Sequence, residues 1–190
     1  MNCVPVVQVR NIKNVVVKMN NRIKKNFKKV FVILGSNIGN RKENLKKAII
    51  EIMKLKKIKI FNMSSLYLSK PWGYLQQDNF YNIALLLIVS YTPLQLLKKL
   101  KKIEKKLGRE KNIRYGPRII DIDIILYEDY VIKRKNLIIP HKQLTKRDFF
   151  LKPLLEIDKN LINPITKKKL EYYLKKLKNK NIIKRINFDL

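Results

Sequence analysis

The chain has 190 residues, of which 46% are hydrophobic, and a formal net charge of +30. This length and composition predict one folded domain of ordinary size with a substantial core. The longest apolar runs, such as residues 83–89, are strand-sized and fall short of the roughly 18 residues that a membrane span needs, so no membrane partner is expected. The single cysteine, Cys3, cannot form an internal disulfide, which favours a reducing, cytoplasmic environment.

The positive charge is extreme, and alone it would suggest nucleic acid, an anionic membrane surface or a polyphosphate as partner. The lysines are instead spread along the whole chain beside many Asn and Ile residues, and they form no basic stripe. We interpret most of the charge as a general compositional bias, with anion binding accounting for a smaller, local part. Nucleic acid is therefore not the expected partner.

Residues 1–29 contain no Asp or Glu, and Lys, Arg and Asn interrupt their Val clusters. We predict that they form a basic N-terminal extension. The segment has no uninterrupted apolar run before a small-residue cleavage site and no Ser, so neither a secretory signal nor a mitochondrial presequence is expected. The folded domain is then expected over residues 30–160, with residues 161–190 forming an amphipathic helix and a tail packed on the domain or appended to it.

The regular pattern begins with the apolar strand VFVIL, residues 30–34, and the turn GSNIGN. A helix is predicted to follow Asn40, because an Asn three residues before Glu43 is typical of a capping box. Two further strands are predicted at residues 58–68 and 80–89. Helical spacing predicts that the buried stripe of the first helix consists of Leu45, Ala48, Ile49 and Ile52.

The best-marked helix follows Thr92, with Pro93 at its first position, Gln95 completing a capping box and Gly108 after its end. Its expected core stripe is Leu97, Leu100, Ile103 and Leu107.

An Asp-bearing strand comes next, followed by a basic hairpin-like segment that reaches His141. Helices are predicted near residues 147–156 and 168–177. The central order β-α-β-β-α-β predicts an α+β fold of the ferredoxin-like type, in which helices pack on an antiparallel sheet.

The Asp-bearing strand places Asp121 and Asp123 in an otherwise apolar segment, although aspartate is depleted in strands and costly to bury without a partner. Alternation puts the two carboxylates on one face, roughly 7 Å apart at Cβ, where they can hold divalent cations against a phosphate. A solvated sheet face with ordinary charges is the alternative. The opposite, core-facing side is expected to consist of Ile120, Ile122, Ile124 and Leu126.

Arg109, Arg114 and Arg118 flank a loop that also contains Gly116 and Pro117. Guanidinium groups suit phosphate oxygens, and such a loop can close over a nucleotide. Magnesium needs only one or two protein carboxylates when substrate phosphates complete its coordination, so this pattern predicts a magnesium-nucleotide site. No GxxxxGK[ST] motif occurs, which excludes P-loop chemistry.

A second candidate site lies in SKPWGYLQQDNFYNIALLL, where a rigid loop with Trp72 precedes a strand. Phe80 and Asn82 share one face of that strand, so an aromatic face and an amide edge can meet a flat ring together. A core Phe and an Asn bonded to backbone are the alternative. Read alone, the only histidine, His141, and the helical Phe149 suit structural roles.

Residues 30–157 resemble the 6-hydroxymethyl-7,8-dihydropterin pyrophosphokinases, folate-pathway enzymes that transfer pyrophosphate from ATP to a pterin alcohol. The resemblance lies in five segments in the family's order: GSNIGNRKENLKKAI, SSLYLSKPWGYLQQDNFYNIAL, IEKKLGR, RYGPRIIDIDIILY and IPHKQLTKRDFFLKPLLEI. The loop from Arg109 to Arg118 is about one residue shorter than in some relatives, and Asn136 replaces a basic ATP contact.

The resemblance implies that Asp121 and Asp123 bind two Mg²⁺ ions with ATP and are catalytic together with Arg109 and Arg118. The implied pterin-binding residues are Ser69, Lys70, Trp72, Phe80, Asn82, Arg147 and Phe149. The implied nucleotide-binding residues are Glu104, Arg109, Arg118 and His141. We expect a monomeric enzyme in which the pterin oxygen attacks the β-phosphorus of ATP and AMP leaves, without an identified general base.

Two readings from other classes remain. A ferredoxin-like RNA-binding module would share the topology and the basic charge, but the chain lacks the [KR]G[FY][GA]FVxF strand of such domains. Without a metal, the paired carboxylates would also repel RNA phosphates. A basic scaffold degenerated from an enzyme is the third reading, and it fits poorly with so many site residues retained together.

Overall fold

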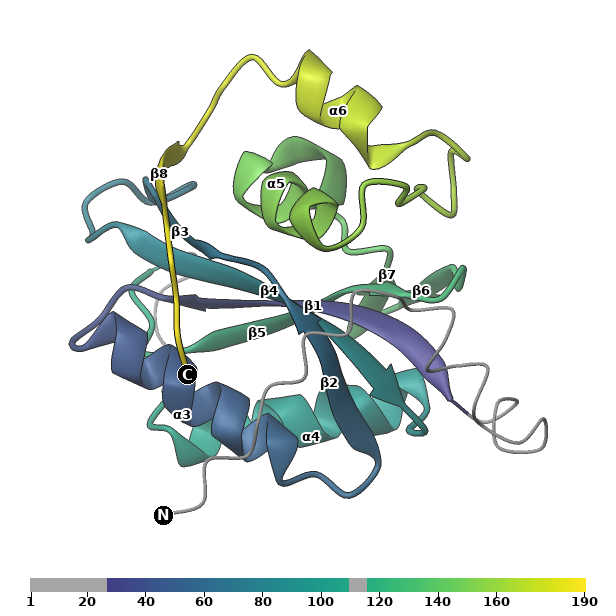
Figure 1. Cartoon of the computed structure of the whole chain (residues 1–190), viewed down its shortest axis with the longest axis horizontal. Coiled ribbons are helices and arrows are strands. Elements are labelled where there is room, and N and C mark those ends of the chain that lie inside the picture. Colours follow the sequence, from purple (N-terminus) through teal and green to yellow (C-terminus); the bar gives the residue numbers. More distant parts are fainter. Residues whose placement is uncertain (1–26, 110–115) are drawn as a thin grey trace.

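The structure is a computed structural model that describes residues 27–109 and 116–190. Most of the predicted N-terminal extension, and Arg114, lie outside these described residues. The architecture is α+β, as predicted, with helices on both faces of one antiparallel sheet (Figure 1). Within the described ranges, no helix has both the length and the apolar character that crossing a membrane requires.

The main sheet has six strands, and all of its pairings are antiparallel. In the order of the sheet they are β5 (Asp121–Tyr127), β1 (Lys28–Ser36), β4 (Phe80–Val89), β3 (Leu66–Ser69) and β8 (Ile182–Ile186), with β2 (Ile58–Met63) paired to another part of β4. A separate hairpin consists of β6 (Ile132–Arg134) and β7 (Leu137–Ile139).

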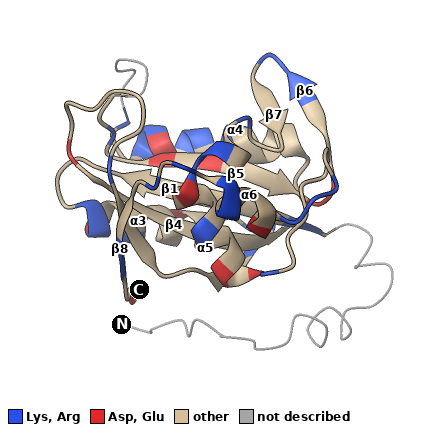
Figure 2. Ribbon diagram, turned by 90° about the horizontal axis from the view of Figure 1, so that it is seen from above, with Lys and Arg blue, Asp and Glu red and all other residues tan. Residues whose placement is uncertain are grey.

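Helices cover both faces of the sheet and create two hydrophobic cores (Figure 1). One face carries α3 (Arg41–Met53) and α4 (Pro93–Lys106), and the other carries α5 (Asp148–Ile157) and α6 (Leu170–Lys176). A short 3-10 helix, η1 (Leu144–Lys146), precedes α5. Lys and Arg are spread over many elements, among them α4, β8 and the hairpin of β6 and β7, as Figure 2 shows.

The predicted helix starts are confirmed. The Asn40 side chain accepts a hydrogen bond from the Glu43 N–H at the start of α3, and Thr92 and Gln95 form a complete capping box at the start of α4. Gly108 follows α4 with a φ of +88°, a conformation that glycine adopts without steric cost. The stripe of α3 is buried as expected and consists of Leu45, Ala48, Ile49 and Ile52.

The predicted stripe of α4 is partly wrong. Leu100 and Ile103 are buried as expected, but Leu96 replaces Leu97 at the centre, and Glu104 is buried too. Successive helix residues lie about 100° apart, so Leu97 falls at the margin of the face that Leu96 shares with Leu100. Leu107 is half-buried, because it caps the C-terminus of the helix.

The single strand predicted at residues 58–68 is in fact two strands, β2 and β3, which pair with different parts of β4. At the break, the Ser64 N–H donates to the Ala84 carbonyl at 3.0 Å, and the Ser64 hydroxyl accepts from the Ala84 N–H at 2.9 Å. The serine side chain thus replaces a backbone acceptor. The realigned β3 places Ser69 opposite Phe80.

Leu126 of β5 is buried as predicted, but it lies on the opposite face of the sheet from the predicted one. A bulge lies opposite β1, because Phe31 pairs with Leu126 while Val32 pairs with Ile124. The extra residue, Ile125, reverses the alternation, so Leu126 packs in the core under α5 and not with the other even-numbered residues. The face that carries Asp121 and Asp123 is therefore covered farther along, which argues against the alternative of a solvated sheet face.

The C-terminal segment contributes a strand that the sequence patterns did not predict. β8 pairs with β3 along residues 182–186 and forms the edge of the main sheet. In Figure 1 it runs as the yellow strand beside β3, and α6 lies over α5.

Candidate active site

A cavity of about 190 Å³ lies where the ends of β1, β3, β4 and β5 face α5. Of the predicted site residues that the structure describes, all except Glu104 and Arg109 line it. They are Ser69, Lys70, Trp72, Phe80, Asn82, Arg118, Asp121, Asp123, His141, Arg147 and Phe149. Two separate sequence patterns, the carboxylate strand and the aromatic loop, are thus brought to one place by the sheet.

Gly35 joins the two patterns. It lies on the central strand β1, where it pairs with Asp121 of β5 on one side and with Asn82 of β4 on the other. A Cβ atom at this position would lie 3.1 Å from the Asn82 Oδ1 and 3.7 Å from a ring carbon of Phe80. The absence of a side chain therefore leaves the floor of the cavity open between the carboxylates and the aromatic pocket.

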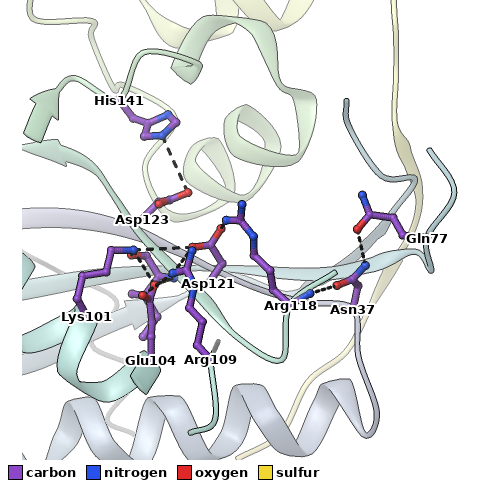
Figure 3. A network of polar contacts seen from close by, with 10 residues as sticks. Asn37, Gln77, Lys101, Glu104, Arg109, Arg118, Asp121, Asp123 and His141 are labelled. Carbon is purple, nitrogen blue, oxygen red and sulfur yellow. Dashed lines mark hydrogen bonds and ion pairs between the residues drawn. The ribbon is translucent and has the colours of Figure 1, made fainter. Parts of the chain in front are cut away.

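Three cations surround Asp121. Arg118 forms an ion pair with it, the Arg109 Nη1 lies 2.8 Å from its Oδ1, and the Lys101 Nζ lies 3.9 Å from the same oxygen (Figure 3). Burial alone would raise the pKa of Asp121, but the positive charges of Arg118, Arg109 and Lys101 outweigh it and lower the pKa below its ordinary value. Asp121 therefore stays ionised.

Asp123 has a different environment. Burial, followed by the negative charge of Asp121, raises the pKa of Asp123 to about 7. The His141 Nε2 lies 4.0 Å from its Oδ2, but burial and the positive charge of Arg147 lower the pKa of His141 to about 4. His141 is therefore neutral near pH 7 and supplies no positive charge to the carboxylate.

The carboxylate pair fits magnesium bound together with a phosphate substrate. A divalent cation beside Asp123 would favour its ionised form, and Mg²⁺ with a nucleotide uses only one or two protein carboxylates. Among residues 27–109 and 116–190, no cluster of three or more His, Cys, Asp or Glu side chains is arranged to hold a metal ion. A site of this kind thus depends on the substrate for the remaining oxygen ligands.

Glu104 and Arg109 do not line the cavity but contact residues of β5, the strand that carries Asp121 and Asp123. The Glu104 side chain is 2% exposed; it accepts a hydrogen bond of 2.6 Å from the Ile122 N–H and one of 2.7 Å from Lys101, and it forms an ion pair with Arg109. Glu104 therefore fixes Lys101 and Arg109 against β5, as Figure 3 shows. We did not single out Lys101 from the sequence, although its spacing from Glu104 on one helix face was the available signal.

The sequence also gave no reason to select Asn37, because its motif, GSNIGN, looked like an ordinary turn. Asn37 is 2% exposed, and its Oδ1 accepts a 2.7 Å hydrogen bond from the Arg118 N–H. Its Nδ2 donates to the Gln77 Oε1 at 3.0 Å (Figure 3). The same Nδ2 donates to the Asp78 carbonyl at 3.1 Å. Asn37 thereby connects the loop of Arg118 with the loop that leads to Phe80.

The aromatic side of the cavity combines residues from three segments. Phe80 belongs to neither hydrophobic core, and Asn82 donates a 2.9 Å hydrogen bond to the Ser69 hydroxyl and not to backbone. These contacts argue against the alternative of a core Phe and a backbone-bonded Asn. The Arg147 guanidinium lies 4.4 Å from the centre of the Trp72 ring, which closes this end of the cavity.

A second hollow of about 230 Å³ adjoins the first. Asp123, His141 and Lys142 line both, so they lie between them. The outer hollow is otherwise formed by Leu97 and Lys101 of α4, by Ile122 and Ile124 of β5, and by residues 135–138 around the β6–β7 turn, including Asn136. Asp123 thus lies between the aromatic cavity and a second hollow that is lined by Lys101, Lys135 and Lys142.

Comparison with known proteins gives a consistent result. The family model described as 7,8-dihydro-6-hydroxymethylpterin-pyrophosphokinase (HPPK) matches residues 31–159. The 2-amino-4-hydroxy-6-hydroxymethyldihydropteridine pyrophosphokinase of Aquifex aeolicus is 46% identical over 144 residues, which are 76% of this chain and 89% of that protein.

Other relatives are much longer than this chain. The folic acid synthesis protein fol1 of Pneumocystis carinii is 44% identical over 153 residues, which cover 80% of this chain but 20% of that protein. The solved structure of Plasmodium falciparum HPPK-DHPS with pteroate has a TM-score of 0.64 at 16% identity, covering 79% of this chain and 42% of that one. This last likeness concerns the fold.

Proposed function

The chain belongs to the 7,8-dihydro-6-hydroxymethylpterin-pyrophosphokinase family and is a pterin pyrophosphokinase of folate synthesis, and we propose that it transfers pyrophosphate from ATP to 6-hydroxymethyl-7,8-dihydropterin with release of AMP. One observation carries this proposal: Gly35 lies between Asp121 and Asn82 on neighbouring strands, so a phosphate-directed acid pair and a flat-ring pocket share one cavity.

In this proposal, Asp121 and Asp123 hold two magnesium ions that accompany the ATP phosphates. The bound ions supply positive charge that offsets the charge of the phosphate oxygens. Arg118, which pairs with Asp121 and lines the cavity, is placed to bind phosphate oxygens that enter it. Arg109 does not line the cavity, and it contributes positive charge through its contact with Asp121. The outer hollow, with Lys101 and Asn136, is the proposed place of the remaining nucleotide, beside the neutral His141.

The pterin ring is proposed to lie between Phe80 and Phe149, which line the same cavity. The Oδ1 of Asn82 faces the floor at Gly35, while its Nδ2 is held by Ser69, so the amide is oriented to meet a ring edge. Lys70, Trp72 and Arg147 complete the wall. This arrangement leaves the hydroxymethyl arm directed along the floor toward Asp121.

The reaction we propose is an in-line displacement. The hydroxymethyl oxygen attacks the β-phosphorus, a new oxygen–phosphorus bond forms, and the bond between the α-phosphate oxygen and the β-phosphorus breaks as AMP leaves. The proton of the hydroxyl group is released to solvent. Holding both reactants in one cavity supplies most of the rate increase, because orientation removes much of the entropic barrier. Arg118 would stabilise the charge of the transferring group directly, and the positive charge of Arg109 would add to this from beside Asp121.

We further propose that the sheet is ferredoxin-like. The strand order β5-β1-β4-β2 and the position of α3 after β1 and of α4 after β4 support this assignment. A monomer in the cytoplasm is the proposed form of the enzyme, in keeping with a sequence whose single cysteine, Cys3, offers no internal disulfide.

The test is an assay of AMP release from ATP by the purified full chain, with and without added hydroxymethyldihydropterin and over a range of Mg²⁺ concentrations. We expect release that requires both the pterin and the metal. ATP hydrolysis that does not depend on the pterin would contradict the proposal. A parallel RNA titration at several salt concentrations tests the alternative of an RNA-binding module. Steep salt-dependent binding of RNA without pterin turnover would favour that alternative.

A further inference from the structure

Asp148 is a buried acid that the proposed reaction does not use. It is 1% exposed, and it begins α5 between Arg147 and Phe149, which both line the aromatic side of the cavity. Burying a carboxylate is costly unless hydrogen bonds satisfy it. Asp148 itself is not among the lining residues, so its role must be exerted through its neighbours.

The partners of Asp148 lie far away in the sequence. Its Oδ2 accepts hydrogen bonds from the N–H groups of Asn181 at 2.8 Å and Ile182 at 2.9 Å, and its Oδ1 accepts one from the Phe149 N–H at 2.9 Å. Consecutive N–H groups of a regular strand point to opposite sides, so two of them reach one oxygen only where the strand is irregular. The register of β8 against β3 shifts next to Ser69, where Ile182 pairs.

Asn181 contacts both walls of the cavity at once. Its N–H donates to Asp148, while its carbonyl accepts a 2.9 Å hydrogen bond from the Lys70 N–H at the end of β3. Lys70 lines the cavity and is two residues from Trp72, over which the Arg147 guanidinium lies at 4.4 Å. The contacts thus close a ring that runs from Lys70 through Asn181 to Asp148 and Arg147, and back through Trp72.

We propose that Asp148 is a positioning residue for the pterin, and that residues 181–182 are the element through which it aligns α5 with β3. Without this link, the start of α5, which carries Arg147 and Phe149, loses its hydrogen-bonded tie to Lys70, whereas the far end of α5 stays bound to β3 through Glu156 and Tyr67. The inference rests on the proposed pterin site. It also gives a specific role to a segment beyond residues 31–159, the part of the chain that the family model matches.

The test compares variants of two acids that anchor the same strand. Asp148→Ala removes the link at the cavity, and Asp148→Asn retains an acceptor oxygen. Glu156→Gln weakens the contact with Arg185 at the other end of β8, away from the cavity. For each purified full-length variant, pterin KM and ATP KM are measured, together with pterin binding in the presence of a non-hydrolysable ATP analogue.

We expect Asp148→Ala to raise the pterin KM about tenfold, because hydrogen bonds to a buried charged group are lost, and Asp148→Asn to raise it about threefold. The ATP KM should change less than twofold in both. Glu156→Gln should lower the melting temperature while leaving both KM values within about twofold of the unmodified chain, since its hydrogen bonds lie at the far end of the strand.

Equal effects of Asp148→Asn and Glu156→Gln on the pterin KM would overturn the inference, as would parallel changes in the pterin and ATP values. If Asp148→Ala does not fold, the comparison of Asp148→Asn with Glu156→Gln decides. Asn82→Ala separates the two levels of the proposal. A raised pterin KM in Asn82→Ala with no effect at Asp148 rejects only the positioning role, whereas no effect at Asn82 rejects the pterin site.

Discussion

Asn37 and Arg118 exchange two hydrogen bonds: the Asn37 N–H donates to the Arg118 carbonyl at 3.0 Å, and the Arg118 N–H donates to the Asn37 Oδ1 at 2.7 Å. The buried amide of Asn37 therefore fixes the backbone of a residue whose side chain pairs with Asp121. This relationship makes the turn after β1 part of the active site, although Asn37 itself does not line the cavity.

Replacing Asn37 by Ala should lower turnover about tenfold, because two loops lose a shared anchor and Arg118 keeps only one of its two hydrogen bonds to residue 37. The measurement is kcat for AMP release at saturating substrates. Asn40→Ala is the matched control in the same turn: it should cost about 1 kcal/mol of stability by removing the cap of α3, with near-normal turnover. Equal kcat values for the two variants would contradict this role of Asn37.

Arg118→Ala should slow the chemical step about a hundredfold while weakening ATP binding less than tenfold, because its charge matters most when negative charge moves to the leaving group. Single-turnover kinetics separates the two effects. Arg134→Ala, in the exposed hairpin, controls for the loss of one positive charge and should leave the rate unchanged. An unchanged single-turnover rate in Arg118→Ala would refute the assignment.

Asp123→Ala should abolish magnesium-dependent turnover and leave the fold intact. The side chain belongs to neither hydrophobic core and is 29% exposed, so its removal creates no core cavity. The melting temperature, measured without nucleotide, should stay within a few degrees of that of the unmodified chain. Near-normal turnover across a magnesium titration would show that Asp123 does not hold the metal.

Gly35→Ala should raise the pterin KM several-fold, because the new Cβ would lie 3.1 Å from the Asn82 Oδ1 and intrude on the cavity floor. Gly39→Ala is the control. At Gly39 a Cβ meets nothing within 4 Å, but the φ of +61° costs about 1 kcal/mol for a residue with a side chain. Steady-state kinetics should therefore show a pterin-specific defect at position 35 and only lower stability at position 39.

The ionisation of Glu156 should contribute to the pH dependence of the free energy of unfolding. Burial alone would raise the pKa of Glu156, but hydrogen bonds from Ser65 and Tyr67 outweigh burial and lower it. The folded-state pKa is then below the unfolded value of about 4.3, so ionised Glu156 stabilises the protein above that pH. This contribution is lost as the pH falls through the folded-state pKa.

Glu156→Gln should therefore lower the free energy of unfolding by about 1 kcal/mol at pH 7, with the difference shrinking below about pH 4. Denaturant unfolding at a series of pH values measures it. Asp129→Asn, at an exposed position after β5, should show a small difference throughout. A difference for Glu156→Gln that stays constant down to pH 3 would contradict the prediction.

The sequence predicted those features whose signals are local. The bounds of β4, the caps of α3 and α4 and the shared face of Asp121 and Asp123 follow from residue type and period, and the structure confirms them. Features that depend on a distant partner were missed. The bulge at Ile125 is defined only against β1, and β8 is a strand only because β3 offers an edge.

The same distinction applies to the site. Carboxylates and arginines in a short segment indicate chemistry by themselves, whereas Asn37 is an ordinary turn residue until Arg118 and Gln77 are beside it. Asp148 was missed for a similar reason, because its partners Asn181 and Ile182 lie far along the chain. Lys101 has one partner on its own helix, Glu104, but its place beside Asp121 depends on β5. The sequence therefore indicated the reactive groups of the site better than the residues that hold them in position.

Because Gly35 pairs with both Asn82 and Asp121, the sheet also sets the distance between these two residues. Adjacent strands are spaced about 4.8 Å apart, so the amide of Asn82 and the carboxylate of Asp121 are anchored two strand spacings from each other, at about 10 Å. Backbone hydrogen bonding sets this distance between the Cα atoms of Asn82 and Asp121, and rotation of either side chain leaves it unchanged. A heterocycle whose alcohol arm is one carbon longer should therefore still enter the aromatic pocket, yet overshoot the point of phosphorus attack.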